Sequence, residues 1–297
     1  MPHATAFCPA NISLIFETYD AEPPHGRGSL GVGITFDKGV TARVSRLSAE
    51  AEADAGTEKG TGAGAAAAAK SEIIVAGKHW EFPTVRSVLA GLTTEPLRVE
   101  LDAAFPFGCG FGMSGASALA TAFAADSLLG LHLDRHTLGM TAHRAEVDNA
   151  TGLGDVGGQF NGGIMIKTRR HEPLLVENLP LTAKTLHYRI HGPISTAEVI
   201  NSREKLLHIN RAGHAAMAEI REAGAALTLE QLFRISHQFA TGSHLLQSPA
   251  VAADIASAEA AGHAATMIML GEAVISTGPF PGSTAAGVVF EGARVMK

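Results

Sequence analysis

The feature that most constrains this chain is a glycine-rich loop that runs directly into a helix of small residues, within residues 106–130. Its sequence is PFGCGFGMSGASALATAFAADSLLG, and the Ala- and Leu-rich part ends at Gly130. Glycines permit positive φ angles and let backbone N–H groups approach a ligand closely. The first N–H groups of a helix attract anions, and the helix dipole adds to this attraction. The pattern therefore predicts a phosphate-binding loop, with a tight packing turn as the alternative.

Two common phosphate loops fit this segment poorly. The Walker pattern G-x-x-x-x-G-K-[ST] is absent, because no Lys follows the glycines. Residues 110–115 satisfy G-x-G-x-x-G, but a dinucleotide site needs an apolar strand that ends at the first glycine, and an acid after a second strand. Phe105 and Pro106 intervene here, and residues 131–140 contain no second strand. A nicotinamide-dependent enzyme is therefore the weakest alternative.

Composition and charge exclude several other classes. The chain is 46% hydrophobic and 18% charged, so it can bury a core. Its formal net charge of −6 argues against nucleic-acid binding, because no excess of cations is available to displace counterions. The two cysteines, Cys8 and Cys109, exclude a disulfide framework. No apolar run reaches membrane-spanning length and no signal peptide is recognised, so we expect a cytoplasmic protein without a membrane partner.

The remaining sequence predicts strands and helices in both halves, with a boundary near residues 170–190. Residues 29–47 alternate in hydrophobicity on both sides of Asp37-Lys38-Gly39, which predicts two strands around a turn. Residues 48–72 contain no large apolar residue, which predicts a mobile surface insertion. Ser195 and Glu198 form a capping-box pattern, which predicts one long helix to about Gly224.

Three segments resemble the motifs of the GHMP small-molecule kinases. The loop PFGCGFGMSGASA is similar to the second family motif, P-x-x-x-G-L-G-S-S-A-A. CPANISLIFE, at residues 8–17, resembles the first motif, and AHRAEVDNATGLGDVGGQFNGG, at 142–163, resembles the stretch that supplies a metal ligand and the catalytic aspartate. The third motif departs from the family pattern: its counterpart, ATMIMLGEAVIS at 265–276, has lost most of its glycines. The positions that match the second motif are Pro106, Gly110, Gly112, Ser114 and Ala116.

The resemblance implies an α+β, two-domain GHMP kinase fold. Residues 1–175 would form the N-terminal domain with a ribosomal-protein-S5-like unit, and residues 176–297 a ferredoxin-like C-terminal domain. RGSLGVG, GFGMSGASAL and MIMLGEAV are similar to an archaeal subgroup whose acceptor is pantoate. The implied reaction is ATP-dependent phosphorylation of pantoate to 4-phosphopantoate in coenzyme A synthesis. A homodimer would also agree with the resemblance.

The resemblance also assigns roles to individual residues. Ser114 and Glu146 would hold Mg²⁺, and Asp155 would act as a base or orienting acceptor for the attacking hydroxyl. The plainer alternatives are an N-cap serine, a solvated helix-end carboxylate and an aspartate in an Asx turn. Asp148 is a weaker candidate for the catalytic carboxylate. The expected ATP-binding residues are Gly108, Gly110, Phe111, Gly112, Met113, Ser114, Gly115 and Ala116.

The acceptor carries a carboxylate, so its pocket needs a cation or several N–H donors. Arg27 and Arg144 are candidates, because a guanidinium can bind a carboxylate through two parallel hydrogen bonds, although a surface ion pair explains each equally well. Asn11, Ser29 and Gly154 complete the predicted substrate site. Homoserine, shikimate or mevalonate as acceptor, and a non-catalytic nucleotide-binding protein, remain alternatives.

Overall fold

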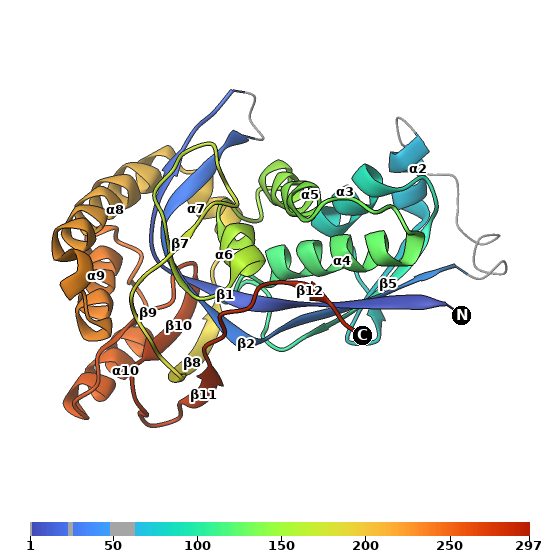
Figure 1. Ribbon diagram of the computed structural model, residues 1–297. Helices are drawn as coiled ribbons and strands as arrows, with labels where there is room; N and C mark the ends of the chain where they lie inside the picture. Colours follow the sequence, from blue (N-terminus) through green and yellow to red (C-terminus); the bar gives the residue numbers. More distant parts are fainter. Residues whose placement is uncertain (1, 23–25, 48–62) are drawn as a thin grey trace.

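The computed structural model describes residues 2–22, 26–47 and 63–297, which form two lobes that pack together (Figure 1). The larger lobe combines a sheet with helices α2 to α6, and the smaller one combines a second sheet with helices α7 to α10. The predicted α+β class is confirmed. Within the described ranges, no helix has both the length and the apolar character needed to cross a membrane.

The larger sheet is built on a long antiparallel pair, β1 (His3–Tyr19) and β2 (Gly28–Arg46). In the described residues the sheet has eight strands. Six follow the order β12-β1-β2-β5-β3-β4, while β6 pairs with β2 and β7 with β6. Only β3 and β5 pair in parallel within that described set. The other strands are β3 (Glu72–Val75), β4 (Lys78–His79), β5 (Leu97–Ala103), β6 (Ile164–Lys167), β7 (Glu177–Asn178) and β12 (Arg294–Val295).

The prediction of two strands around a turn in residues 29–47 was wrong, because β2 is continuous through this segment. Its pairing with β1 shifts between Pro9↔Gly39 and Ala10↔Phe36, so Asp37 and Lys38 form a bulge and are exposed. A bulge interrupts the alternation of a strand without reversing the chain. The sequence signal is the same as for a turn, but the hydrophobic residues on either side continue along one strand.

Helices α3, α4 and α5 lie together on one side of the larger sheet (Figure 1). The middle helix, α4, has twelve buried residues, most of them Ala or other small residues, so its neighbours can approach it closely. Residues 48–62 of the predicted insertion lie outside the described residues, whereas 63–70 form α2, whose Ala68 is buried. The helices are α2 (Ala63–Lys70), α3 (Pro83–Leu92), α4 (Met113–Leu129), α5 (Arg135–Asp148) and α6 (Asp155–Asn161).

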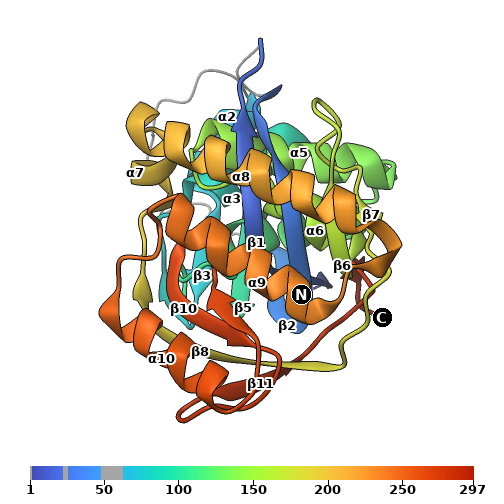
Figure 2. The ribbon, with the colours of Figure 1, turned by 90° about the vertical axis from the view of Figure 1, so that its left-hand side faces the viewer.

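The smaller lobe has an antiparallel sheet of order β11-β8-β10-β9. Its helices α8 and α9 lie across β1 (Figure 2), where Ser236 of α9 donates to the Leu14 carbonyl at 2.7 Å. The elements are β8 (Thr185–Pro193), α7 (Thr196–Ile200), α8 (Arg203–Ala223), the 3-10 turn η2 (Gly224–Ala226), α9 (Leu229–Gly242), α10 (Pro249–Ala260), β9 (Ala265–Met267), β10 (Gly271–Ser276) and β11 (Thr284–Gly287).

The single long helix predicted from Ser195 is in fact two helices. Ser195 caps α7 as predicted, but α7 ends at Ile200 and Ser202 caps a second helix, α8. The Ser202 hydroxyl accepts the Lys205 N–H at 3.4 Å, and such a serine favours a new helix start over continuation of the old one.

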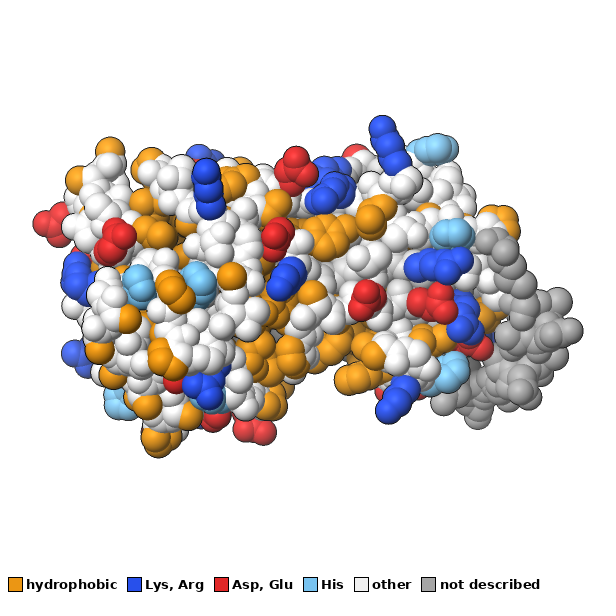
Figure 3. Space-filling view, turned by 90° about the horizontal axis from the view of Figure 1, so that it is seen from below, with side chains coloured by type: hydrophobic (Ala, Val, Ile, Leu, Met, Phe, Trp, Pro, Cys, Tyr) orange, Lys and Arg blue, Asp and Glu red, His pale blue; other side chains and the backbone are white. Residues whose placement is uncertain are grey.

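The chain returns to the larger sheet in residues 288–296. Val288 forms a bridge with Phe36, and β12 pairs with β1. The Ala293 N–H donates to the Gln159 carbonyl at 2.9 Å, and Arg135 donates to the Ala293 carbonyl at 2.7 Å. Seen from below, hydrophobic side chains gather where the two lobes meet (Figure 3).

Candidate active site

The glycine-rich loop ends at the N-terminus of α4 and has the backbone geometry that its glycines permit. Gly108, Gly110 and Gly112 have φ angles of +78°, +84° and +65°, a region that favours glycine. Gly112 is the N-cap of α4 and has no side chain to accept the first N–H groups of the helix. These donors are therefore available to an anion.

The segment 265–276, expected as the third motif, packs against this loop through close backbone contacts. A Cβ atom on Gly110 would lie 2.7 Å from the Met269 carbonyl oxygen, and one on Gly271 would lie 2.0 Å from the Cys109 carbonyl oxygen. Both positions therefore need glycine because of close backbone approach. The Ile194 N–H donates to the Gly108 carbonyl at 2.9 Å and fixes the start of the loop.

Ser114 and Glu146 meet at the first turn of α4. The Ser114 hydroxyl donates to Glu146 Oε1 at 2.6 Å, and the Thr151 hydroxyl donates to the same oxygen at 2.6 Å. Thr84, on α3, lies beside them, with its hydroxyl 3.0 Å from that of Thr151. Glu146 is only 2% exposed, and this burial raises its pKa from 4.5 to about 7 despite the two hydrogen bonds.

This cluster has the donor chemistry that Mg²⁺ requires. A carboxylate and hydroxyls are hard oxygen ligands, and among the described residues no cation lies beside the buried Glu146 carboxylate to neutralise it. No group of three or more His, Cys, Asp or Glu side chains suited to a metal occurs among the described residues. A magnesium ion here would therefore take its remaining ligands from phosphate oxygens and water, as Mg²⁺ commonly does.

Asp155 faces the loop from the first position of α6. Asn11 donates through Nδ2 to Asp155 Oδ1 at 2.8 Å, and the Asn11 backbone N–H donates to the Phe111 carbonyl at 3.1 Å. A Cβ on Gly112 would lie 3.3 Å from the Asp155 Cβ, and Gln159 Nε2 donates to the Gly112 carbonyl at 2.7 Å. The structure thus brings the two glycine-rich segments together. Burial raises the pKa of Asp155, while the Asn11 hydrogen bond and the charge of Lys167 lower it.

A pocket opens beside Asp155, and its cation is Lys167 at the end of β6. Lys167 is 5% exposed and donates to the Pro173 carbonyl at 3.3 Å. Burial lowers its pKa from 10.5 to about 8, and the charge of Asp155 opposes this shift. No ion pair of Lys167 is formed with a carboxylate in the described part of the chain. The pocket is lined by Asn11, Ser13, Ile15, Phe16, Ser29, Leu30, Gly31, Val32, Gly33, Gly154, Gly158, Met165, Lys167 and Val176.

The other residues predicted for the site lie in different places. Asn11, Ser29 and Gly154, which were predicted as substrate-binding residues, line the pocket. Arg27 instead pairs with Asp20 at 3.1 Å and borders a separate surface hollow near the β1–β2 tip. Arg144 is exposed on α5. In the loop, the Phe111 side chain stacks on Phe105 in the core, so only its backbone faces a phosphate site.

Sequence reasoning missed Lys167. The available signal was a single charge at the end of the otherwise apolar strand segment IMIK, directly after the glycine cluster that carries Asp155. Lys is rarely buried without a partner, so such a position deserves consideration as a ligand site.

Comparison with known proteins shows which family of enzymes this site resembles. The family model for the GHMP kinases N terminal domain matches residues 78–163, which contain the loop, Ser114, Glu146 and Asp155. This part of the chain matches the GHMP kinases, and the resemblance predicted from the sequence is confirmed. Because these proteins are kinases, ATP is the phosphoryl donor implied for this chain.

Two pantoate kinases are similar to this chain over most of its length. Pantoate kinase from Methanospirillum hungatei is 26% identical over 282 residues, which cover 94% of this chain and 88% of the relative. Pantoate kinase from Thermococcus kodakarensis is 28% identical over 279 residues, covering 91% and 86%. A solved phosphotransferase related to the CoA biosynthesis pathway superposes with a TM-score of 0.80 at 23% identity and covers 99% of both chains. Homoserine kinase from Cytophaga hutchinsonii gives 0.67 at 19% identity, covering 100% of this chain and 98% of that one.

Proposed function

We propose that this protein transfers the γ-phosphoryl group of ATP to the terminal hydroxyl of pantoate. The observation that carries the proposal is a pocket that the buried Lys167 lines together with Asn11, the residue whose side chain donates to Asp155. A hydroxy acid needs both groups, one for its hydroxyl and one for its carboxylate. The full-length similarity to pantoate kinases supports the same acceptor.

The donor side of the site binds the nucleotide. The loop amides from Gly108 to Gly112 and the free N–H groups of α4 would hold the triphosphate. Ser114 and Glu146 would hold Mg²⁺, which neutralises charge on the phosphate oxygens when bound. Thr84 and Thr151 keep the Glu146 cluster in place through their hydroxyls.

The acceptor side positions the hydroxy acid. Lys167 would donate to its carboxylate, with Ser29 and Asn11 as further polar contacts on the pocket wall. Asp155 Oδ2 would accept a hydrogen bond from the attacking hydroxyl and take its proton as the new P–O bond forms. Asn11 holds the other Asp155 oxygen, which fixes the carboxylate toward the substrate. Ile15 and Met165 offer an apolar wall for the two methyl groups of pantoate.

The test is an acceptor panel with Mg²⁺ and ATP. Pantoate, homoserine, shikimate and mevalonate are compared for ADP release, and phosphorus NMR identifies the product. We expect pantoate to be the best acceptor and Asp155→Asn to abolish its phosphorylation. Asp148→Asn is the matched control, because Asp148 is an exposed residue at the end of α5. Background rates with pantoate, together with a signal from another acid, would contradict the acceptor assignment and retain the kinase. The expected homodimer and cytoplasmic location stay predictions.

A further inference from the structure

Besides Asp155, helix α6 carries a second polar residue that faces the phosphate loop. Gln159 is fully buried, and its Nε2 donates to the Gly112 carbonyl at 2.7 Å. It follows Asp155 by four residues, so the two side chains lie on the same face of the helix. A Cβ on Gly112 would be 2.7 Å from Gln159 Nε2 and 3.3 Å from the Asp155 Cβ. One short helix therefore carries both the proposed base and a direct hydrogen bond to the loop.

The carbonyl that Gln159 binds belongs to the first peptide of α4. Gly112 is the N-cap of this helix, and its carbonyl also accepts the Ala116 N–H at 2.9 Å. In a trans peptide, the C=O and the following N–H point in opposite directions. The two donors on the Gly112 carbonyl therefore fix the direction of the Met113 N–H, which is the first of the free helix donors available to a phosphate. Glycine has little conformational preference of its own, so this peptide depends on such bonds for its orientation.

Packing alone does not explain an amide at position 159. Gln159 Oε1 has no hydrogen-bond partner among the described residues, and a buried polar atom without a partner lowers stability. A Met side chain has a similar length and would fill the same space without this cost. The bond to the Gly112 carbonyl is the contact that an apolar residue could not make. The role of Gln159 therefore lies in that bond.

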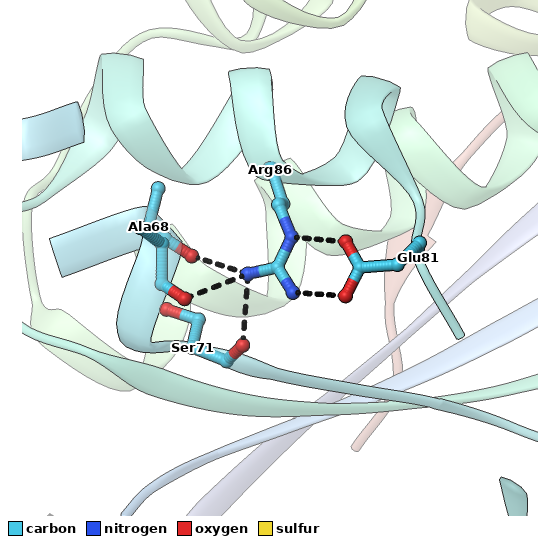
Figure 4. Close-up of polar contacts among 5 residues, drawn as sticks. Ala68, Ser71, Glu81 and Arg86 are labelled. Carbon is cyan, nitrogen blue, oxygen red and sulfur yellow. Dashed lines mark hydrogen bonds and ion pairs between the residues drawn. The ribbon is translucent and has the colours of Figure 1, made fainter. Parts of the chain in front are cut away.

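A polar network elsewhere in the larger lobe gives a matched comparison. Figure 4 shows Arg86 of α3, whose Nη1 donates to the carbonyls of Ala68 and Ser71 at 2.7 and 3.0 Å. Arg86 also forms a two-point contact with Glu81, at 3.2 and 3.3 Å. These bonds join α3 to the end of α2, and none of these partners belongs to the phosphate loop. Arg86 thus satisfies backbone carbonyls, as Gln159 does, without touching the loop.

We propose that Gln159 is a positioning residue, which holds the first peptide of α4 in a fixed place relative to Asp155. The loop amides and the base then face the same phosphoryl group. This inference rests on the proposed kinase function, because the loop must hold the triphosphate for the bond to matter. Gln159 acts through the Gly112 peptide and does not itself touch the acceptor. Its loss therefore weakens phosphate binding and slows the transfer, but leaves acceptor binding nearly unchanged.

The test uses inorganic tripolyphosphate as a probe of the loop, because this ligand has no base and needs no acceptor. We expect Gln159→Met to raise the calorimetric Kd for tripolyphosphate about 3- to 10-fold. It should also lower kcat about tenfold or more, while the acceptor KM stays within about twofold. Gln159→Asn is a second variant, which keeps the amide but is one methylene too short to reach Gly112. Arg86→Met is the matched control, and should lower the Tm without changing the tripolyphosphate Kd.

The outcomes separate this inference from the proposed function. An unchanged tripolyphosphate Kd, or an unchanged kcat, in a folded Gln159→Met or Gln159→Asn protein would overturn the positioning role and leave the kinase intact. An equal rise of the tripolyphosphate Kd in Arg86→Met would also overturn it, because the effect would then reflect a general loss of stability. No binding of tripolyphosphate or ATP to the unmodified chain would overturn both proposals.

Discussion

Replacing Lys167 by Met tests whether the buried ammonium group serves substrate binding or stability. Lys167 is 5% exposed, and it donates a hydrogen bond to a neutral group, the Pro173 carbonyl. Met has a similar length and is apolar, so it can occupy the same space without a charge. We expect Lys167→Met to be more stable than the original protein and to bind the hydroxy acid much less well.

The magnitude follows from the pKa of Lys167, which burial lowers from 10.5 to about 8. One pKa unit corresponds to 1.36 kcal/mol, so keeping this group charged at pH 7 costs about 3 kcal/mol. Lys167→Met removes this cost, but it also removes the Lys167 charge that lowers the pKa of the nearby Asp155, so part of the gain in stability is lost. We therefore expect a net rise of about 1–3 kcal/mol in the free energy of unfolding at pH 7.

The lowered pKa of Lys167 also determines how its contribution to stability changes with pH. The folded-state pKa of Lys167 lies below its unfolded value, so between about pH 8 and 10.5 the unfolded chain binds more protons. The Lys167 contribution to stability therefore becomes more favourable as pH rises through this window. The stability advantage of Lys167→Met should be largest below about pH 8 and disappear near pH 10.5.

Urea denaturation at several pH values measures the stability, and initial rates measure the KM for the acceptor. Loss of a charge-assisted hydrogen bond should raise KM about 10- to 100-fold. Lys184→Met, at an exposed lysine, is the control and should change neither quantity. The reasoning fails if Lys167→Met lowers stability by more than about 1 kcal/mol, or if the acceptor KM is unchanged.

Three further changes test other parts of the site. Asp155→Asn should lower kcat about 10²- to 10⁴-fold while leaving the calorimetric Kd for ATP nearly unchanged; a kcat within a few-fold of the original would remove Asp155 from the mechanism. Glu146→Gln should raise the Mg²⁺ concentration for half-maximal activity about tenfold or more, as a titration at fixed ATP would show, because the amide is a weaker ligand for a hard cation; an unchanged titration curve would exclude Glu146 as a ligand. Gly110→Ala should destabilise the protein by about 1–3 kcal/mol in thermal unfolding and weaken ATP binding, since it combines a φ of +84° with a Cβ placed 2.7 Å from the Met269 carbonyl; wild-type behaviour would show that the loop can relax.

The sequence predicted best those features that depend on local backbone chemistry. The loop at residues 108–115 requires glycines in consecutive turns, and this pattern is visible without knowledge of the fold. The capping box of Thr228 and Gln231 in the structure depends on the same local chemistry, since its two hydrogen bonds join residues three apart. Ser195 was also correct as a helix start, but a second cap at Ser202 decided where that helix ends.

Features that depend on distant parts of the chain could not be read in this way. Arg27 and Lys167 both offer a cation, and only the pairing of β2 with β6 places Lys167, and not Arg27, in the pocket beside Asp155. Trp80 lies 27 residues before Phe107, and nothing in the local pattern indicates that their rings meet. Gly271, in segment 265–276, likewise packs against the loop at Cys109, a contact between two segments that are far apart in the sequence.

The pairing of β12 with β1 has a consequence for how this protein folds as it is synthesised. Ala6 and Phe7 of β1 pair with residues 294–295, so this part of the β1 edge stays unpaired until those residues have been synthesised. An unpaired strand edge is a template for association with other chains. A chain that stops before residue 288 would therefore leave Ala6 and Phe7 of β1 without this partner strand.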